Sequence, residues 1–170
     1  CVDMRLSWWH VYLAVGAFAT AVSLPLTWAA CRLGPAMGFV DQPHREAHKR
    51  HGEPVSMLGG CAIFLAWFGT IVAGFLVAPR LLPLLSPAVA EYVPAIEKAL
   101  PRLSVIALGG LALLALGLID DRKPLSALTK FAGQLLVAAL TASAGVKITF
   151  FIEQPLAVFL ITTGWILFIV

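Results

Sequence analysis

Two adjacent aspartates, Asp120 and Asp121, directly follow a long uncharged run, in the stretch "GLIDDRK". Their carboxylates are the first candidates for a functional site. Neighbouring carboxylates repel each other and tend to recruit a cation or share a proton. Mg²⁺ prefers carboxylate oxygens and commonly bridges to a substrate phosphate. The pair therefore predicts a Mg²⁺ or Mn²⁺ site for phosphate chemistry, with direct ligation by either aspartate left open. The alternative is that the pair ends a helix in water, with Ser126 capping the next helix.

A polar loop at residues 38–60, "GFVDQPHREAHKRHGEPVSMLGG", is the second candidate. Its cluster "HKRH" at residues 48–51 carries basic side chains of the kind that bind phosphate oxygens and neutralise their charge. A cationic loop near a metal-binding carboxylate pair is the arrangement expected for a phosphate-rich substrate. The alternative is an anchor to anionic lipid. A zinc site built on the histidines is disfavoured, because no Cys or carboxylate completes a ligand set at recognised spacing.

The composition shows which elements must hold these residues. The 170 residues are 60% hydrophobic and only 12% charged, about half the charged content of a soluble domain. Long uncharged runs, which do not alternate in polarity, favour membrane-spanning helices over a barrel. We expect an all-α integral membrane protein, a single membrane domain over residues 1–170 with about five transmembrane helices at 8–31, 58–78, 103–119, 125–146 and 154–170.

Three further expectations concern local structure. The stretch 146–152, "VKITFFI", is rich in β-branched and aromatic residues and predicts a short strand or hairpin outside the membrane. The proline-rich stretch 79–102 predicts a loop that lies on the surface. Small residues allow close contact between helices in lipid, and this role is expected for Gly69, Gly74, Gly109, Gly110, Gly117 and Gly133.

The order of crossings places the loop 32–57 and the aspartate pair on one membrane face. Counts of Lys and Arg, seven on that face against five on the other (Arg5, Arg80, Lys98, Arg102 and Lys147), favour a cytoplasmic location for it. The net charge of +3, interrupted by apolar runs, does not indicate nucleic acid as a partner.

At these residues the chain resembles the polyprenyl-phosphate N-acetylhexosamine-1-phosphate transferases, the glycosyltransferase 4 family. The family's first-loop pattern of Asp–x–Pro, a basic pair, His, Pro and Gly–Gly corresponds here to Asp41, Pro43, Lys49–Arg50, His51, Pro54 and Gly59–Gly60. The family's Asp–Asp pair, which follows an apolar helix, corresponds to Asp120–Asp121. The loop departs from the pattern in its length, which leaves His48 as an alternative to His51, and in Ser56, which stands where a proline is common.

The resemblance implies a multi-pass enzyme of the bacterial inner membrane whose active face is cytoplasmic. It would transfer a sugar-1-phosphate, GlcNAc-1-phosphate for the branch indicated by "EPVSMLGG" and "GLIDD", from a UDP-sugar to undecaprenyl phosphate. UMP is released and a cell-envelope polymer, such as O-antigen of lipopolysaccharide, enterobacterial antigen or teichoic acid, is begun. Asp120 and Asp121 would serve the Mg²⁺–phosphate chemistry. Lys49, Arg50, His51 and Asp41 would bind substrate.

The family carries two further motifs, one rich in Asn and Asp and one rich in His, that are absent from these 170 residues. We therefore expect the N-terminal half of a longer enzyme, inactive by itself, with a homodimer as a candidate assembly. Two alternatives remain open. One is the branch that uses UDP-MurNAc-pentapeptide in peptidoglycan synthesis. The other is a non-catalytic multi-helix membrane protein, which charged residues at mid-helix depth would favour.

Overall fold

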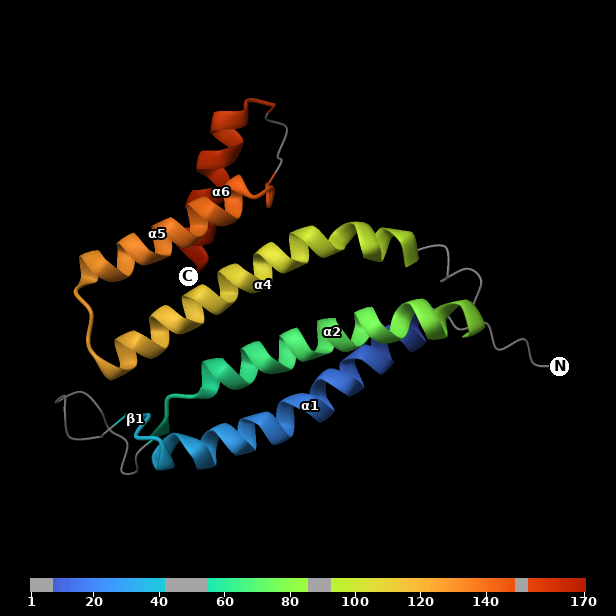
Figure 1. Ribbon diagram of the computed structural model, residues 1–170, viewed down its shortest axis with the longest axis horizontal. Helices are drawn as coiled ribbons and strands as arrows, with labels where there is room; N and C mark the ends of the chain where they lie inside the picture. Colours follow the sequence, from blue (N-terminus) through green and yellow to red (C-terminus); the bar gives the residue numbers. More distant parts are fainter. Residues whose placement is uncertain (1–7, 42–54, 86–92, 149–152) are drawn as a thin grey trace. The chain divides into compact units, whose positions relative to one another are not determined.

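The computed structural model describes residues 8–41, 55–85, 93–148 and 153–170. Contacts divide the chain into two compact units, 1–98 and 99–170, and each is described by itself. The prediction of a single domain therefore stays a prediction. The elements, in chain order, are α1 (Trp8–Ala36), β1 (Val40–Asp41), β2 (Val55–Ser56), α2 (Gly59–Leu85), α4 (Val93–Arg122), α5 (Ala127–Ser143) and α6 (Pro155–Ile169) (Figure 1).

The expected all-α membrane architecture is confirmed. Within the described residues, three helices are long and apolar enough to cross a membrane, over Trp9–Ala36, Gly59–Val77 and Glu97–Arg122. Two shorter apolar helices follow, at Ala127–Ser143 and Pro155–Ile169. Their 17 and 15 residues lie at or below the usual minimum of about 17 for a span. Crossing by α5 and α6 stays a prediction.

The prediction of a surface loop at 79–102 is wrong for the parts that the structure describes. Helix α2 continues to Leu85 and α4 already begins at Val93, while residues 86–92 lie outside the described chain. Pro94 is the second residue of α4, where proline is tolerated because the first helical N–H groups have no partner to lose. Pro101 lies within α4 and removes a single helical hydrogen bond, which the helix accommodates.

The strand expected at 146–152 is not found at residues 146–148, and residues 149–152 lie outside the described chain. Helix α5 ends at Ser143, three residues earlier than expected, because Gly145 adopts a left-handed φ of 99°. The Gly145 N–H donates to Ala142 O and the Val146 N–H to Thr141 O, the two bonds of a Schellman cap. An unpredicted strand pair, β1 with β2, forms in the first unit.

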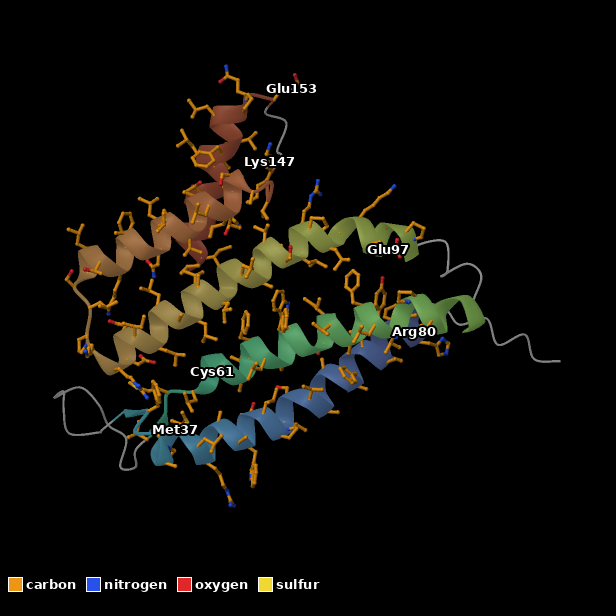
Figure 2. All side chains as sticks on the ribbon, in the orientation of Figure 1. Met37, Cys61, Arg80, Glu97, Lys147 and Glu153 are labelled. Atoms are coloured by element: carbon orange, nitrogen blue, oxygen red, sulfur yellow. The ribbon has the colours of Figure 1, made fainter. Side chains whose placement is uncertain are left out.

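In the first unit, α1 and α2 lie side by side (Figure 1). Small buried side chains, among them Ala30, Ala62 and Ala66, allow this approach. Helix α1 continues through Pro25 and Pro35 and ends in a second Schellman cap, with Gly38 at φ 74°. Figure 2 shows Met37 and Cys61 at the end of the pair where the strands lie, and Arg80 at the opposite end.

In the second unit, α4 and α5 approach each other at two glycines. A Cβ on Gly109 would lie 2.9 Å from Thr141 Oγ1, and one on Gly133 would lie 2.9 Å from Leu116 Cδ2. The packing role expected for these two glycines is confirmed. For Gly69, Gly74 and Gly117 the packing role stays a prediction: within the part of the chain that is described, a Cβ there would meet nothing within 4 Å.

Helix α6 packs on α5 through buried side chains that include Ala138, Ala142 and Val158. Thr162, which is 1% exposed, links α6 to the connection between α5 and α6. Its hydroxyl donates to Val158 O at 2.7 Å and accepts the Ile148 N–H at 3.0 Å. The connection between α5 and α6 is thereby tied to the middle of α6.

Candidate active site

Asp120 lies in the last turn of α4, and both of its carboxylate oxygens are engaged. Oδ2 lies 2.6 Å from the ammonium nitrogen of Lys130, and Oδ1 accepts the Leu125 N–H at 2.8 Å. The Asp120 side chain is 25% exposed and that of Lys130 is 43% exposed. A carboxylate with a cation on one oxygen and an amide N–H on the other has a fixed orientation and a stabilised negative charge.

The sequence brings these three groups together through a short turn. Helix α4 ends at Arg122 and α5 begins at Ala127. A connection this short makes consecutive helices antiparallel neighbours. Lys130 is the fourth residue of α5, so it lies one turn into that helix and can reach back to the end of α4.

The start of α5 is fixed by its cap. Ser126 has extended backbone angles and its hydroxyl accepts the Thr129 N–H at 3.2 Å. The two hydroxyls of Ser126 and Thr129 are 2.8 Å apart. The capping role predicted for Ser126 is therefore confirmed, and it sets the register of the turn that carries Lys130.

Asp121 occupies the neighbouring position in the last turn of α4 and is exposed. Each carboxylate oxygen can accept more than one hydrogen bond or ligand, so the contacts of Asp120 leave it able to contact a cation. Among the described residues, no three His, Cys, Asp or Glu side chains gather as a metal cage. A pair of carboxylates fits Mg²⁺, which is commonly bound through one or two carboxylates together with water and substrate phosphates.

The strand pair of the first unit lies on either side, in sequence, of the basic cluster at residues 48–51 of the polar loop. Val40 pairs with Ser56 and Asp41 with Val55 in antiparallel register. Asp41 is described only in its backbone, as the last residue of β1. The remaining predicted substrate residues, Lys49, Arg50 and His51, lie outside the described residues. Their approach to the aspartates stays a prediction.

Sequence reasoning missed two side chains that the structure brings to these places. Lys130 was not among the predicted site residues, but it pairs with Asp120. The sequence signal that indicates this ion pair is an acidic residue at the end of one helix followed by a basic residue one turn into the next helix. Ser56 was noted only as a departure from a proline pattern, but its hydroxyl bonds to the carbonyl of Ala30. No sequence signal indicated that contact.

Several curated proteins resemble this chain. It is 32% identical over 134 residues to the "Probable undecaprenyl-phosphate N-acetylglucosaminyl 1-phosphate transferase" of Bacillus subtilis, a match that covers 79% of this chain and 31% of the relative. It is 30% identical over 135 residues to the "Decaprenyl-phosphate N-acetylglucosaminephosphotransferase" of Mycobacterium tuberculosis, covering 78% of this chain and 29% of the relative. The protein of the same description from Mycolicibacterium smegmatis is 35% identical over 96 residues, 56% of this chain and 20% of the relative.

The chain thus spans about a third of the length of the Bacillus subtilis and Mycobacterium tuberculosis relatives. In a chain of 170 residues, a match of 134 residues includes residues 37–134 wherever it begins, and with them both the basic loop and the aspartate pair. No protein-family model matches the chain. No solved structure matches it either.

Proposed function

We propose that this multi-pass membrane chain forms part of an enzyme that transfers GlcNAc-1-phosphate from UDP-GlcNAc to undecaprenyl phosphate. The proposal rests on homology to the polyprenyl-phosphate N-acetylhexosamine-1-phosphate transferases, which confirms the family resemblance. The product would begin a cell-envelope polysaccharide. The observation that carries the proposal is the match to the Bacillus subtilis transferase over a stretch that includes both motifs. The names of both relatives specify N-acetylglucosamine, which favours a UDP-GlcNAc donor over UDP-MurNAc-pentapeptide.

In the proposed reaction, an oxygen of the lipid phosphate attacks the phosphorus that carries the sugar. A new P–O bond forms, the P–O bond to UMP breaks, and UMP leaves with the electron pair. Such a transfer needs positioning and neutralisation of charge more than covalent help from the protein. When bound, Mg²⁺ would neutralise phosphate charge and orient the diphosphate.

The chain's own residues would divide the remaining tasks. Asp120 and Asp121 would hold the cation at the end of α4, and one of them would take the proton of a monoanionic lipid phosphate. Lys130 and the Leu125 N–H support this role because they fix the Asp120 carboxylate in its ionised form. Lys49, Arg50 and His51, with Asp41, would bind the donor at its nucleotide end. The predicted crossing order, which places both motifs on the cytoplasmic face of the inner membrane, supports their joint action.

The test uses the full-length protein encoded by the reading frame, expressed in membranes. UMP release from UDP-GlcNAc should require undecaprenyl phosphate and Mg²⁺, and Mn²⁺ should substitute in part. Asp120→Asn or Asp121→Asn should abolish it. Glu97→Gln is the matched control, since Glu97 is exposed near the other end of α4 and should leave the rate unchanged (Figure 2). Turnover of UDP-MurNAc-pentapeptide alone would overturn the choice of donor, and no turnover of either donor would favour a non-catalytic membrane protein.

A further inference from the structure

A groove of about 450 Å³ lies between α1 and α2 in the first unit. Its volume falls within the range of ~300–1,000 Å³ that is usual for ligand pockets. Most of its lining is apolar and comes from both helices: Ala19, Leu24, Ile63, Ala66, Trp67 and Ile71. Leu24 and Ile63 are 66% and 71% exposed, so the groove is open at these two side chains. Both lie within apolar spans, which places the groove at the depth of the membrane hydrocarbon.

The two threonines of the lining have their hydroxyl protons engaged within their own helices. Thr20 Oγ1 donates to Gly16 O at 2.8 Å, and Thr70 Oγ1 donates to Ala66 O at 2.7 Å. Such a bond to the carbonyl four residues earlier leaves no hydroxyl proton for a ligand. Ser23 is the remaining polar residue of the lining. The groove therefore suits a hydrocarbon chain better than a polar ligand, which would lose its hydration on entering.

One ridge of α1 leads from this groove to a positive charge. Thr20, Leu24, Trp28 and Arg32 follow one another at intervals of four residues, which places them on the same side of the helix. The first two line the groove, and Arg32 lies about 12 Å beyond Leu24 along the helix axis. Arg32 is also the first charged residue after the uncharged run 10–31. It therefore lies where α1 passes from the hydrocarbon to the lipid headgroups.

Trp28 orients the guanidinium group of Arg32. The guanidinium carbon lies 4.6 Å from the centre of the Trp28 ring, a cation–π contact that turns the charge back toward the groove. No carboxylate is paired with Arg32 within the parts of the chain that the structure describes. A guanidinium stacked on a ring still presents N–H groups along its edges, where they match the oxygens of a phosphate. Arg32 thus offers an oriented anion-binding group directly beyond the groove.

We propose that the groove and Arg32 together bind one anionic phospholipid of the surrounding membrane, with an acyl chain between α1 and α2 and the phosphate on the Arg32 guanidinium. The lining selects hydrocarbon, and the positive charge selects a headgroup with net negative charge over a neutral one. The order along α1, a charge at headgroup level and an apolar groove below it, is the order of phosphate and acyl chain in a phospholipid. The site involves neither aspartate of the candidate active site and does not rest on the proposed function.

The test uses Trp67 as the reporter, because it lines the groove and bromine on an acyl chain quenches tryptophan fluorescence on contact. The full-length protein is placed in phosphatidylcholine nanodiscs that contain a minor fraction of brominated phosphatidylglycerol or, separately, of brominated phosphatidylcholine. Trp67→Phe, measured in parallel, gives the quenching that the other tryptophans contribute. We expect Trp67 to show about a fivefold preference for phosphatidylglycerol, since one cationic side chain near the membrane surface attracts an anionic lipid by about that factor.

Variants separate the headgroup contact from the groove. Arg32→Gln should abolish the preference, while Arg32→Lys keeps the charge without the planar fork and should retain part of it. Arg80→Gln is the matched control: it removes the same charge from the opposite end of the helix pair, where the guanidinium donates to Leu76 O at 3.0 Å (Figure 2). Its preference should equal that of the wild type. Ala19→Leu fills the groove and should lower the quenching of Trp67 by both brominated lipids.

Each part of the site can be overturned by itself. Equal quenching of the wild type by the two lipids, or a preference that survives in Arg32→Gln, overturns the headgroup contact. A Trp67 that neither lipid quenches overturns the groove as a lipid site, because another segment of the enzyme or a second copy then covers it. Turnover of UDP-GlcNAc enters none of these measurements. A full-length protein without transferase activity would overturn the proposed function and leave the lipid site standing.

Discussion

Lys130 Nζ lies 2.6 Å from Asp120 Oδ2, so an ion pair joins the last turn of α4 to the first turn of α5. The second oxygen of the same carboxylate binds the Leu125 N–H in the turn between the helices. One aspartate of the predicted catalytic pair thus also closes the turn on which it lies.

Lys130→Met should lower kcat/KM for UMP release by about tenfold or more, because a hydrogen bond to a charged group is lost and the Asp120 carboxylate loses its orientation. Lys130→Arg keeps the positive charge and should retain more activity. Lys147→Met is the matched control, since Lys147 is exposed and lies in the connection at the other end of α5 (Figure 2). Equal kcat/KM in Lys130→Met and Lys147→Met would contradict a role for the ion pair in the site.

Ser126→Ala should destabilise the start of α5. The hydroxyl of Ser126 caps this helix, and removing such a cap costs about 1 kcal/mol. Ser126→Asp keeps an acceptor at the cap and should preserve stability. Hydrogen exchange at residues 127–130, measured with the melting temperature in detergent, checks both variants, and identical protection in Ser126→Ala and wild type would speak against the cap.

Gly133→Val should destabilise the packing of α5 on α4, because its side chain would enter the space held by Leu116. Overpacking of this kind costs about 1–3 kcal/mol. The added variant Leu116→Ala should recover part of the loss by making room. Gly117→Ala is the control: a Cβ there meets nothing within 4 Å, so it should be neutral or raise the melting temperature slightly. Equal melting temperatures for the two glycine variants would refute the close contact.

Thr162→Val and Thr163→Val should differ although the two residues are neighbours in α6 and both are buried. Thr162→Val leaves the Ile148 N–H without its acceptor and should cost about 1–3 kcal/mol. The Thr163 hydroxyl has no hydrogen-bond partner within the described part of the chain, so replacing it by a methyl group should be neutral or stabilising. The difference in melting temperature between the two variants measures the contribution of the Thr162 hydrogen bond. Equal melting temperatures, or a lower one for Thr163→Val, would disprove this contribution.

Particular residues show how far the sequence predicts the fold. The cores of the helices follow from uncharged apolar runs such as 103–119, since a span in lipid must satisfy its own backbone hydrogen bonds. The ends were less predictable: α2 and α4 extend through Pro79 and Pro101, which local rules treat as helix breakers. The strand pair at residues 40–41 and 55–56 was missed because two-residue strands carry no periodic pattern.

By itself the sequence determined the membrane class of the protein, the capping role of Ser126 and the resemblance that its relatives confirm. These follow from properties carried by consecutive residues: apolar length, the capping residue and the order of motif residues. Only the tertiary structure decided that Lys130 pairs with Asp120, that Gly133 packs closely against Leu116, and that Ser56 bonds to Ala30. These contacts depend on how separate segments approach each other, and Ser56 and Ala30 are 26 residues apart in a chain whose local pattern fixes no such distance.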